Sequence, residues 1–283
     1  MSARSIITAR QARLGTELRK LRERAGLSGR EAARGMGFAE TRISAVESAR
    51  VGVSGERVRY LAGQYACDDT ALIDALVAMA DERGHGWWEE YRGLVPSGYL
   101  DLAELENKAA HLSTFQTMHV PGLLQTEEHI QAVFGASVPK LSEEQIERRT
   151  EFRLRRQETL GADQAVPYRA LIHEAALRIK AADSKAARRQ LLHILERSEL
   201  PQVTVRVIPF EVDGFSGIAH PLVHAGGPVP QLDTVMVEGP HGGAFLDAEA
   251  QLARYRQALR QVEEAALGVI ESRQFIHRLA QTM

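Results

Sequence analysis

The sequence has only one cysteine, Cys67, in 283 residues, so no disulfide can form within the chain. No apolar run approaches the roughly 18 residues that a membrane-spanning helix needs. The first residues also lack the apolar stretch of a secretory signal. These absences disfavour secreted and membrane-embedded classes of protein, and we expect a cytoplasmic protein that makes no contact with a membrane.

The signatures of common catalytic and metal sites are missing too. Neither G-x-x-x-x-G-K-[ST] nor G-x-G-x-x-G occurs. Ser216 lacks the second glycine of a nucleophile elbow, because Ile218 stands in its place. His220, His224 and His241 have spacings that match no common zinc site, and cysteine ligands are absent. We therefore predict no catalytic residue, no metal site and no cofactor, and we expect that the protein is not an enzyme.

The charge is distributed unevenly along a chain of ordinary globular composition, which is 44% hydrophobic and 25% charged. Its length leaves room for about two domains. Residues 1–70 hold 13 of the 35 Lys and Arg but only 8 of the 37 Asp and Glu, so the remainder carries 22 basic against 29 acidic residues. A basic first part on an acidic body suits a partner with many phosphates, bound by the first part alone.

Residues 27–50 have the pattern of two short helices joined by a tight turn. Ser28 is a good N-cap, and Glu31 three residues later completes a capping box. Gly37 supplies a residue that can adopt a positive φ after a helix. A second helix is expected at about 39–48, with Ile43 and the residue three positions later facing inward.

The outer face of this second helix is polar. A helix, a glycine turn and a helix of this kind lay a recognition helix into the major groove of double-stranded DNA. Arg42 is the expected main donor, because its guanidinium can bridge O6 and N7 of guanine. The residues predicted to read base edges are Glu40, Thr41, Arg42, Ser44 and Ala45.

Polar and basic residues around this motif are candidates for contacts with DNA phosphates. Those on the helix before the motif fit either phosphate contacts or a merely solvated face, and both interpretations stay open. The predicted phosphate contacts are Arg19, Arg22, Arg24, Ser28, Arg30 and Arg50.

Ten positions of this stretch match a known pattern: Leu27, Ser28, Glu31, Ala33, Gly37, Ile43, Ser44, Val46, Glu47 and Arg50. In residue types and spacing they resemble the helix-turn-helix regulators of the XRE (repressor/Cro-like) family. The resemblance implies a small helical DNA-binding domain. The chain departs from the family pattern where Ala39 replaces a Ser or Thr cap, Glu40 a base-reading Gln, and Ala49 a closing Gly. The first two departures bear on base contacts, and the third predicts a slightly different exit from the helix.

An amphipathic helix precedes the motif. Leu14, Leu18 and Leu21 form its apolar stripe, and Gly26 ends it. Residues 1–12 either extend this helix or form an arm.

Two further helices follow the motif, one capped by Ser54 and one at about 69–82. Five helices in this length give the repressor-like architecture, so we predict an all-α helix-turn-helix DNA-binding domain at 1–82. The composition break at 83–86 predicts a short linker.

Residues 87–283 mix helical and extended patterns, which predicts an α+β protein whose C-terminal domain is mixed α/β. Strands are expected at 112–120, 168–173, 203–208, 222–225, 234–238 and 242–246, and long helices at 143–159, at 184–200 and from 247 onward. The arginines of the helix at 143–159 alternate with glutamates, which is typical of a salt-bridged solvated face.

Several motifs in this second region resemble an uncharacterised domain that follows the same helix-turn-helix module in actinomycete XRE-family regulators. They lie at 87–88, 120–126, 153–157, 173–177, 205–210 and 253–256. The resemblance implies a regulator that is often paired with a small partner protein encoded nearby.

One helix-turn-helix module meets only about a half-site, so we expect a homodimer held together by the C-terminal domain. Its candidate interface for a second copy or a partner consists of Trp87, Trp88, Leu252, Tyr255 and Leu259. The alternative is that these residues fill the core, or, for the tryptophans, a seam between the domains.

The patterns favour a sequence-specific DNA-binding transcriptional regulator, located at the nucleoid. Its C-terminal domain is expected to dimerise and to bind a small partner protein or a small-molecule effector. An alternative is an antitoxin-like protein that sequesters a small partner protein and autoregulates its operon. An enzyme with a DNA-binding appendage is a third class, which the missing motifs disfavour.

Overall fold

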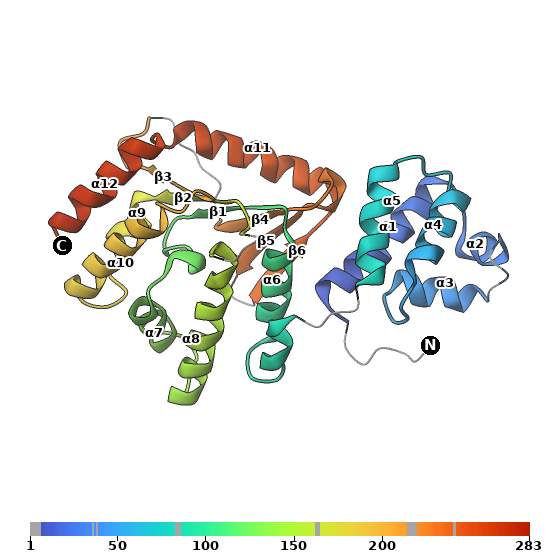
Figure 1. The fold of residues 1–283 in the computed structure, drawn as a ribbon, viewed down its shortest axis with the longest axis horizontal. Helices are drawn as coiled ribbons and strands as arrows, with labels where there is room; N and C mark the ends of the chain where they lie inside the picture. Colours follow the sequence, from blue (N-terminus) through green and yellow to red (C-terminus); the bar gives the residue numbers. More distant parts are fainter. Residues whose placement is uncertain are drawn as a thin grey trace. The chain divides into compact units, whose positions relative to one another are not determined.

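A computed structural model describes residues 7–35, 37, 39–82, 86–161, 165–213, 220–239 and 242–283. The chain divides into two compact units, Met1–Gly86 and Trp87–Met283 (Figure 1). Ser216, Ile218, His241 and most of the predicted linker lie outside the described residues. No helix in the described ranges is both long and apolar enough to cross a membrane.

The first unit is helical, as predicted. Its helices are α1 (Ala9–Arg24), α2 (Gly29–Gly35), α3 (Glu40–Glu47), α4 (Gly55–Gln64) and α5 (Thr70–Asp81). Thr8 caps α1 by accepting a hydrogen bond from the Gln11 amide at 3.3 Å. Of the two interpretations of residues 1–12, the described part therefore extends the helix.

The predicted leucine stripe of α1 lies in the core of this unit. Leu14, Leu18 and Leu21 are all buried, together with Ile43 of α3. α1 and α3 approach closely at Gly15, where a Cβ atom would lie 2.4 Å from the backbone oxygen of Glu47. A glycine at this position therefore allows the C-terminal end of α3 to rest against α1.

Two helices of this unit end at an alanine in the left-handed region, with φ of 58° at Ala49 and 50° at Ala66. After α4, the amide of Cys67 donates to Ala62 O at 3.0 Å and that of Ala66 to Gly63 O at 3.1 Å, which is a Schellman motif. Ala49 adopts the positive φ that a glycine would adopt. The cost of an alanine at this position appears as backbone strain. After α3 the Val51 amide donates to Ala45 O at 3.1 Å, a pattern that differs from the one after α4.

Replacing Ala66 with glycine is expected to stabilise the first unit by about 0.5–1 kcal/mol, because glycine adopts this φ without a Cβ clash. The Ala66 side chain is exposed, so its methyl group adds no packing. Ala49 is the matched control: it is only 2% exposed, and losing its buried methyl group costs about 0.8 kcal/mol, which offsets the gain. Denaturation followed by circular dichroism measures both variants, and a loss of stability for Ala66→Gly would contradict the strain at Ala66.

The second unit contains a six-stranded sheet in the order β3-β2-β1-β4-β5-β6. Its strands are β1 (His111–Gln116), β2 (Tyr168–His173), β3 (Val203–Ile208), β4 (Leu222–Gly226), β5 (Thr234–Gly239) and β6 (Gly242–Leu246). β1, β2 and β3 run parallel, whereas β4, β5 and β6 are joined by antiparallel pairing that starts at β1. The fold class predicted from the sequence is therefore confirmed.

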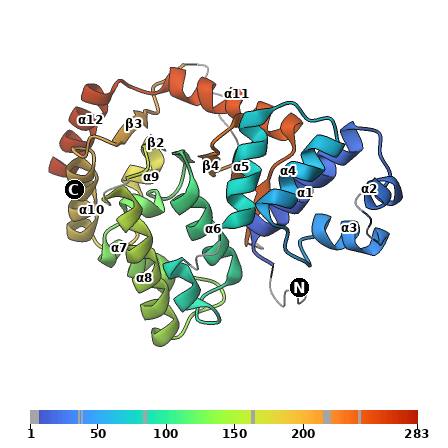
Figure 2. The same cartoon turned by 45° about the vertical axis from the view of Figure 1, so that its right-hand side comes forward.

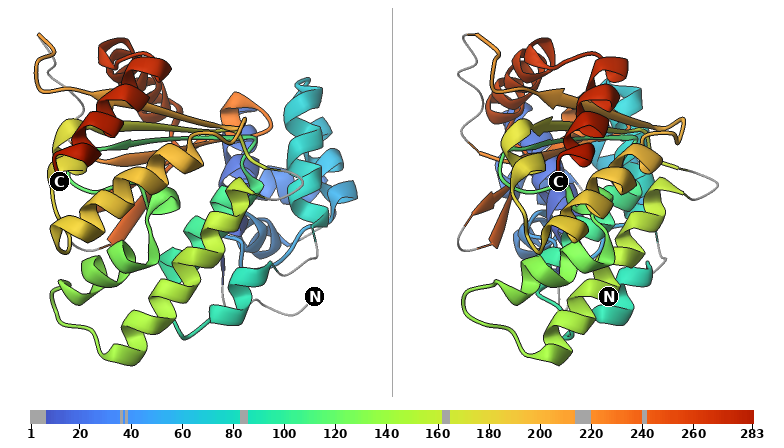
Figure 3. Two further views of the ribbon diagram at one scale, coloured as in Figure 1. Left: turned by 60° about the vertical axis from the view of Figure 1, so that its left-hand side comes forward. Right: turned by 90° about the vertical axis from the view of Figure 1, so that its left-hand side faces the viewer.

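Helices cover both faces of this sheet (Figure 3). The helices of this unit are η1 (Trp87–Tyr91), α6 (Ser97–Lys108), η2 (Gly122–Leu124), α7 (Glu127–Gly135), α8 (Glu143–Gln157), η3 (Glu158–Leu160), α9 (Glu174–Arg178), α10 (Ser184–Arg197), η4 (Pro230–Leu232), α11 (Glu249–Ala265) and α12 (Val269–Gln281). Leu252 of α11 packs on the face that carries Phe115 and Leu171. α10, α12 and η2 pack on the opposite face, and α7 lies beside α8 (Figure 2).

Three of the five residues predicted as a dimer or partner interface, Trp88, Leu252 and Leu259, are buried, whereas Trp87 and Tyr255 are partly buried. Leu252 is 0% exposed and Leu259 8%, because α11 turns its apolar stripe onto the sheet, with Tyr255 packed at its side. Trp88 is 4% exposed in a cluster of aromatic residues, and the Trp87 ring packs against it. The interface prediction is wrong for Trp88, Leu252 and Leu259, because their apolar area is already used within the unit. For Trp87 and Tyr255 it stays a prediction.

The arginines of α8 do not share one environment. Arg148 pairs with Glu151 at the surface, as predicted. Arg156 is 8% exposed and makes two hydrogen bonds to Glu106 of α6, at 2.7 and 2.8 Å. The prediction of a wholly solvated face is wrong for Arg156, because α8 packs against α6 along one side.

Candidate nucleic-acid interface

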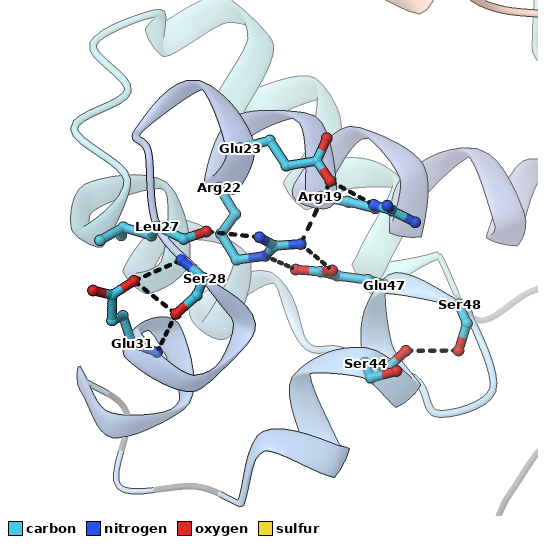
Figure 4. A network of polar contacts seen from close by, with 9 residues as sticks. All are labelled: Arg19, Arg22, Glu23, Leu27, Ser28, Glu31, Ser44, Glu47 and Ser48. Carbon is cyan, nitrogen blue, oxygen red and sulfur yellow. Dashed lines mark hydrogen bonds and ion pairs between the residues drawn. The ribbon is translucent and has the colours of Figure 1, made fainter.

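The turn between α2 and α3 has the geometry that the sequence predicts. The Glu31 amide donates to Ser28 Oγ at 3.3 Å, and the Ser28 amide donates to Glu31 Oε2 at 2.7 Å, which completes the capping box (Figure 4). The hydrogen bonds that the Ser28 hydroxyl and then the Ser28 amide donate to the carboxylate lower the pKa of Glu31. Gly37 has a φ of 65°, the value for which glycine is favoured. The local sequence therefore sets both the start of α2 and the turn into α3.

An ion pair fixes α3 to α1. Arg22 Nε donates to Glu47 Oε1 at 2.6 Å and Arg22 Nη2 to Glu47 Oε2 at 2.9 Å, and both side chains are 11% exposed (Figure 4). Arg22 Nη1 also donates to the backbone oxygen of Leu27, just before α2, at 2.7 Å. Hydrogen bonding to Glu47 raises the pKa of Arg22. One guanidinium thus joins α1, the start of α2 and the end of α3.

The residues predicted to read bases lie on α3. Thr41 and Ser44 are exposed, Arg42 and Ala45 are half-buried, and the Glu40 side chain is 57% exposed. The polar side chains of Glu40, Thr41 and Ser44, in the first two turns of α3, therefore lie at the surface. α3 thus presents polar side chains at the surface, while an ion pair holds its C-terminal end against α1.

The predicted phosphate contacts divide into two groups. Arg19, Arg24, Arg30 and Arg50 are exposed. The pair between Arg19 and Glu23 at 2.7 Å lies at the surface, where such pairs contribute little, so Arg19 remains able to exchange its partner for a phosphate.

Two predicted phosphate contacts are already used within the protein. The Arg22 guanidinium is turned inward to Glu47, so we remove Arg22 from the set. Ser28 Oγ accepts the capping hydrogen bond of α2 and also donates to Glu31 at 2.7 Å.

Two further side chains at the motif, which the sequence patterns did not single out, are exposed. Arg34 lies in the last turn of α2. The Tyr60 ring of α4 is 47% exposed, and its hydroxyl donates to Gly35 O at 2.8 Å, at the end of α2. The exposure of Tyr60 could have been predicted from the sequence, because Tyr60 falls outside the apolar stripe of Val58, Leu61 and Tyr65.

The described residues contain no group of three or more His, Cys, Asp and Glu that is placed to hold a metal. His224 Nε2 lies 3.2 Å from Asp233 Oδ2, which also accepts from Arg256 Nε at 2.8 Å. Hydrogen bonds from these neighbours outweigh burial and lower the pKa of Asp233. Asp233 Oδ1 also accepts a hydrogen bond from the Gly227 amide. Because Arg256 belongs to α11, the Asp233 carboxylate links the loop before β5 to that helix.

Comparison with known families divides the chain in the same way as the fold. Residues 13–76 match a model described as a helix-turn-helix domain. Residues 99–278, more than half of the chain, match a model described as a domain of unknown function (DUF5753). No curated protein and no solved structure matches the chain. The helix-turn-helix match indicates DNA binding and, with it, a role in transcriptional regulation.

Proposed function

The chain belongs to the DUF5753 family and carries a helix-turn-helix domain before that domain, and on this premise we propose that it is a sequence-specific transcriptional regulator. Its first unit binds one half-site through α3, and its second unit dimerises and receives a signal. The observation that carries this proposal is the exposed polar face of α3, which the pair of Arg22 and Glu47 anchors to α1. Genome-wide mapping of bound sites in the host tests it, and a pattern without a shared motif would contradict it.

Arg42→Ala is expected to weaken binding to the mapped site by about 1–3 kcal/mol and to relax the preference at one base position, because a bidentate guanine contact is lost. Fluorescence anisotropy on the site and on single-base variants measures both effects. Arg148→Ala is the matched control, since Arg148 lies on α8 of the other unit and pairs with Glu151 at the surface. Unchanged affinity and unchanged base preference in Arg42→Ala would remove this residue from the recognition set.

Binding is expected to weaken steeply with salt, because Arg19, Arg24, Arg30 and Arg50 are proposed to displace counterions from phosphates. Each arginine replaced by glutamine should lower the slope of log affinity against log salt by about 0.9 if it contacts a phosphate. Arg22→Gln is not interpretable in this series, because its guanidinium stabilises the fold. A slope that none of the four replacements alters would contradict the proposed phosphate contacts.

We propose that two chains bind half-sites about one helical turn, roughly 34 Å, apart. Linking two weakly binding modules raises the affinity without any new contact to DNA. The interface uses surfaces of the second unit other than the buried Leu252 and Leu259. Sedimentation of the full chain measures its oligomeric state, and a monomer at all concentrations would contradict the dimer. A small protein that copurifies in equal amount from the host would instead favour the antitoxin-like role.

A further inference from the structure

A pocket of about 330 Å³ lies in the second unit, between one face of the sheet and the helical layer of α6, η2, α7 and α8. β1, β4, β5 and the start of β6 form its floor. Its apolar lining includes Leu123, Phe134 and Met236, and Tyr99 adds a phenol ring. Pockets of this size and mixed lining hold small organic ligands.

One wall of the pocket is the loop at 120–126, whose distinctive sequence the DNA-binding role leaves unexplained. Glutamine side chains from two helices hold this loop. Gln157 Nε2 of α8 donates to Gly122 O at 2.9 Å, and Gln190 Nε2 of α10 donates to Leu124 O at 2.6 Å. These hydrogen bonds fix the loop without any ligand, so the wall is preformed.

The pocket contains one positive charge that no carboxylate neutralises by contact. Arg156 is paired with Glu106, whereas Arg153, one helical turn before it, forms no ion pair within 4.0 Å among the described residues. Arg153 Nη1 donates instead to the neutral Gln125 Oε1 at 2.8 Å, and its guanidinium lies 4.3 Å from the centre of the Phe134 ring.

The electrostatic surroundings leave Arg153 cationic but uncompensated. Burial, followed by the nearby charge of Arg156, lowers the pKa of Arg153 to about 10, so it stays protonated at neutral pH. The more distant carboxylates of Glu106 and Glu238 act in the opposite direction. Glu106 is already neutralised by Arg156, and Glu238 is exposed. Arg153 is half-buried, and a guanidinium of this kind is stabilised by an anion that reaches it directly.

The lining also contains a buried polar atom without a hydrogen bond among the described residues. Gln116, at the end of β1, is 6% exposed, and its Oε1 accepts no hydrogen bond from any described residue. Leaving a buried acceptor unpaired is unfavourable. A ligand that donates a hydrogen bond here would satisfy it.

We propose that this pocket binds a small organic monocarboxylate with an aromatic or aliphatic body and one hydrogen-bond donor, such as a hydroxyl or an amide N–H. The carboxylate pairs with Arg153, the donor reaches Gln116, and the body packs on Phe134 and the neighbouring apolar groups. A single uncompensated cation near Glu238 favours a monoanion over a phosphate dianion. The assignment rests on the proposed function only in taking this ligand as the signal that the regulator receives.

Calorimetric titration of the full-length protein tests the ligand class directly. The probes are N-acetyl-phenylalanine, indole-3-lactate and 3-hydroxydecanoate, each beside its methyl ester, with phenyl phosphate as a dianion. At least one carboxylate is expected to bind, at least tenfold more tightly than its ester and than phenyl phosphate. Equal binding of acid and ester, tighter binding of the phosphate, or no binding by any carboxylate would overturn the proposal.

Variants identify the site. Arg153→Gln is expected to weaken carboxylate binding about 10- to 100-fold, as for the loss of a charge-assisted hydrogen bond. Arg148→Gln on the same helix is the control, and it should leave the affinity unchanged. Gln116→Leu should raise the melting temperature of the ligand-free protein while it weakens binding several-fold, a combination that a merely structural glutamine would not produce. If Arg153→Gln does not fold, unchanged affinity in Gln116→Leu would still overturn the assignment.

Anisotropy on DNA, with and without the bound carboxylate, separates this proposal from the proposed function. Carboxylate binding that leaves the DNA affinity unchanged keeps the pocket assignment and removes its role as the signal. A protein that binds carboxylate but no DNA contradicts the proposed regulator and leaves the pocket intact.

Discussion

Glu106→Gln is expected to destabilise the second unit by about 3–5 kcal/mol, the range found when one partner of a buried ion pair is removed. The pair of Arg156 and Glu106 is bidentate, with side chains 8% and 3% exposed. Burial alone lowers the pKa of Arg156, but Glu106 raises it beyond its ordinary value. Glutamine keeps the shape and removes the charge, so Arg156 remains cationic beside Arg153 with no counter-ion.

Urea denaturation followed by tryptophan fluorescence measures this effect, because both tryptophans of the chain, Trp87 and Trp88, belong to the second unit. Glu90→Gln is the matched control: Glu90 pairs with Arg155 but is 66% exposed, and solvent screening leaves such pairs contributing little to stability. Replacing Glu106 and Arg156 together with leucine and methionine should recover much of the loss. If Glu106→Gln and Glu90→Gln lowered the free energy of unfolding equally, burial would not be the reason that the pair of Arg156 and Glu106 stabilises the unit.

Glu47→Gln is expected to destabilise the first unit by about 2–4 kcal/mol and to weaken DNA binding far more than Arg42→Ala does. The expected cost is below that of Glu106→Gln, because Arg22 and Glu47 are each 11% exposed and water screens the pair in part. The effect on DNA arises because Glu47 ends α3, and its loss frees the recognition helix from α1.

Hydrogen exchange of the α3 amides, compared with the binding affinity, measures both consequences of Glu47→Gln. Glu23→Gln is the control, because Glu23 touches the same Arg22 at 3.7 Å but is 51% exposed. Gly15→Ala supplies an independent route to the same defect, because its Cβ would clash with Glu47 O at 2.4 Å. Slower exchange or normal affinity in Glu47→Gln would show that the pair does not position α3.

Local signals predicted the motif well because the residues that form it are close in sequence. Ser28 and Glu31 form their capping box within one turn, and Gly37 has its positive φ whatever surrounds it. The strand at 203–208 was predicted from alternation, and its valines are buried as expected. Periodicity of this kind needs no knowledge of distant partners.

Pairings between distant residues could not be predicted in this way. Arg22 reaches Glu47 across 25 positions and Arg156 reaches Glu106 across 50, so an inward arginine and a solvated one look alike in the sequence. The stripe of Leu252 and Leu259 fits a core or an interface equally well, and only the sheet beneath α11 decides between them. The pocket could not be predicted from the sequence for the same reason, because Gln116 and Arg153 lie on separate elements that come together only in the folded protein.

The position of β1 also has a consequence for how the protein emerges from the ribosome. β1 pairs with β2 on one side and with β4 on the other, and β4 begins only at Leu222. A nascent chain that ends before that residue therefore carries the strand His111–Gln116 with one row of amides and carbonyls unpaired. Five of the six side chains of this strand are buried in the folded protein. The growing polypeptide therefore exposes an aggregation-prone strand while more than a hundred further residues are synthesised. A chaperone that shields this segment during that interval is expected to raise the yield of folded protein.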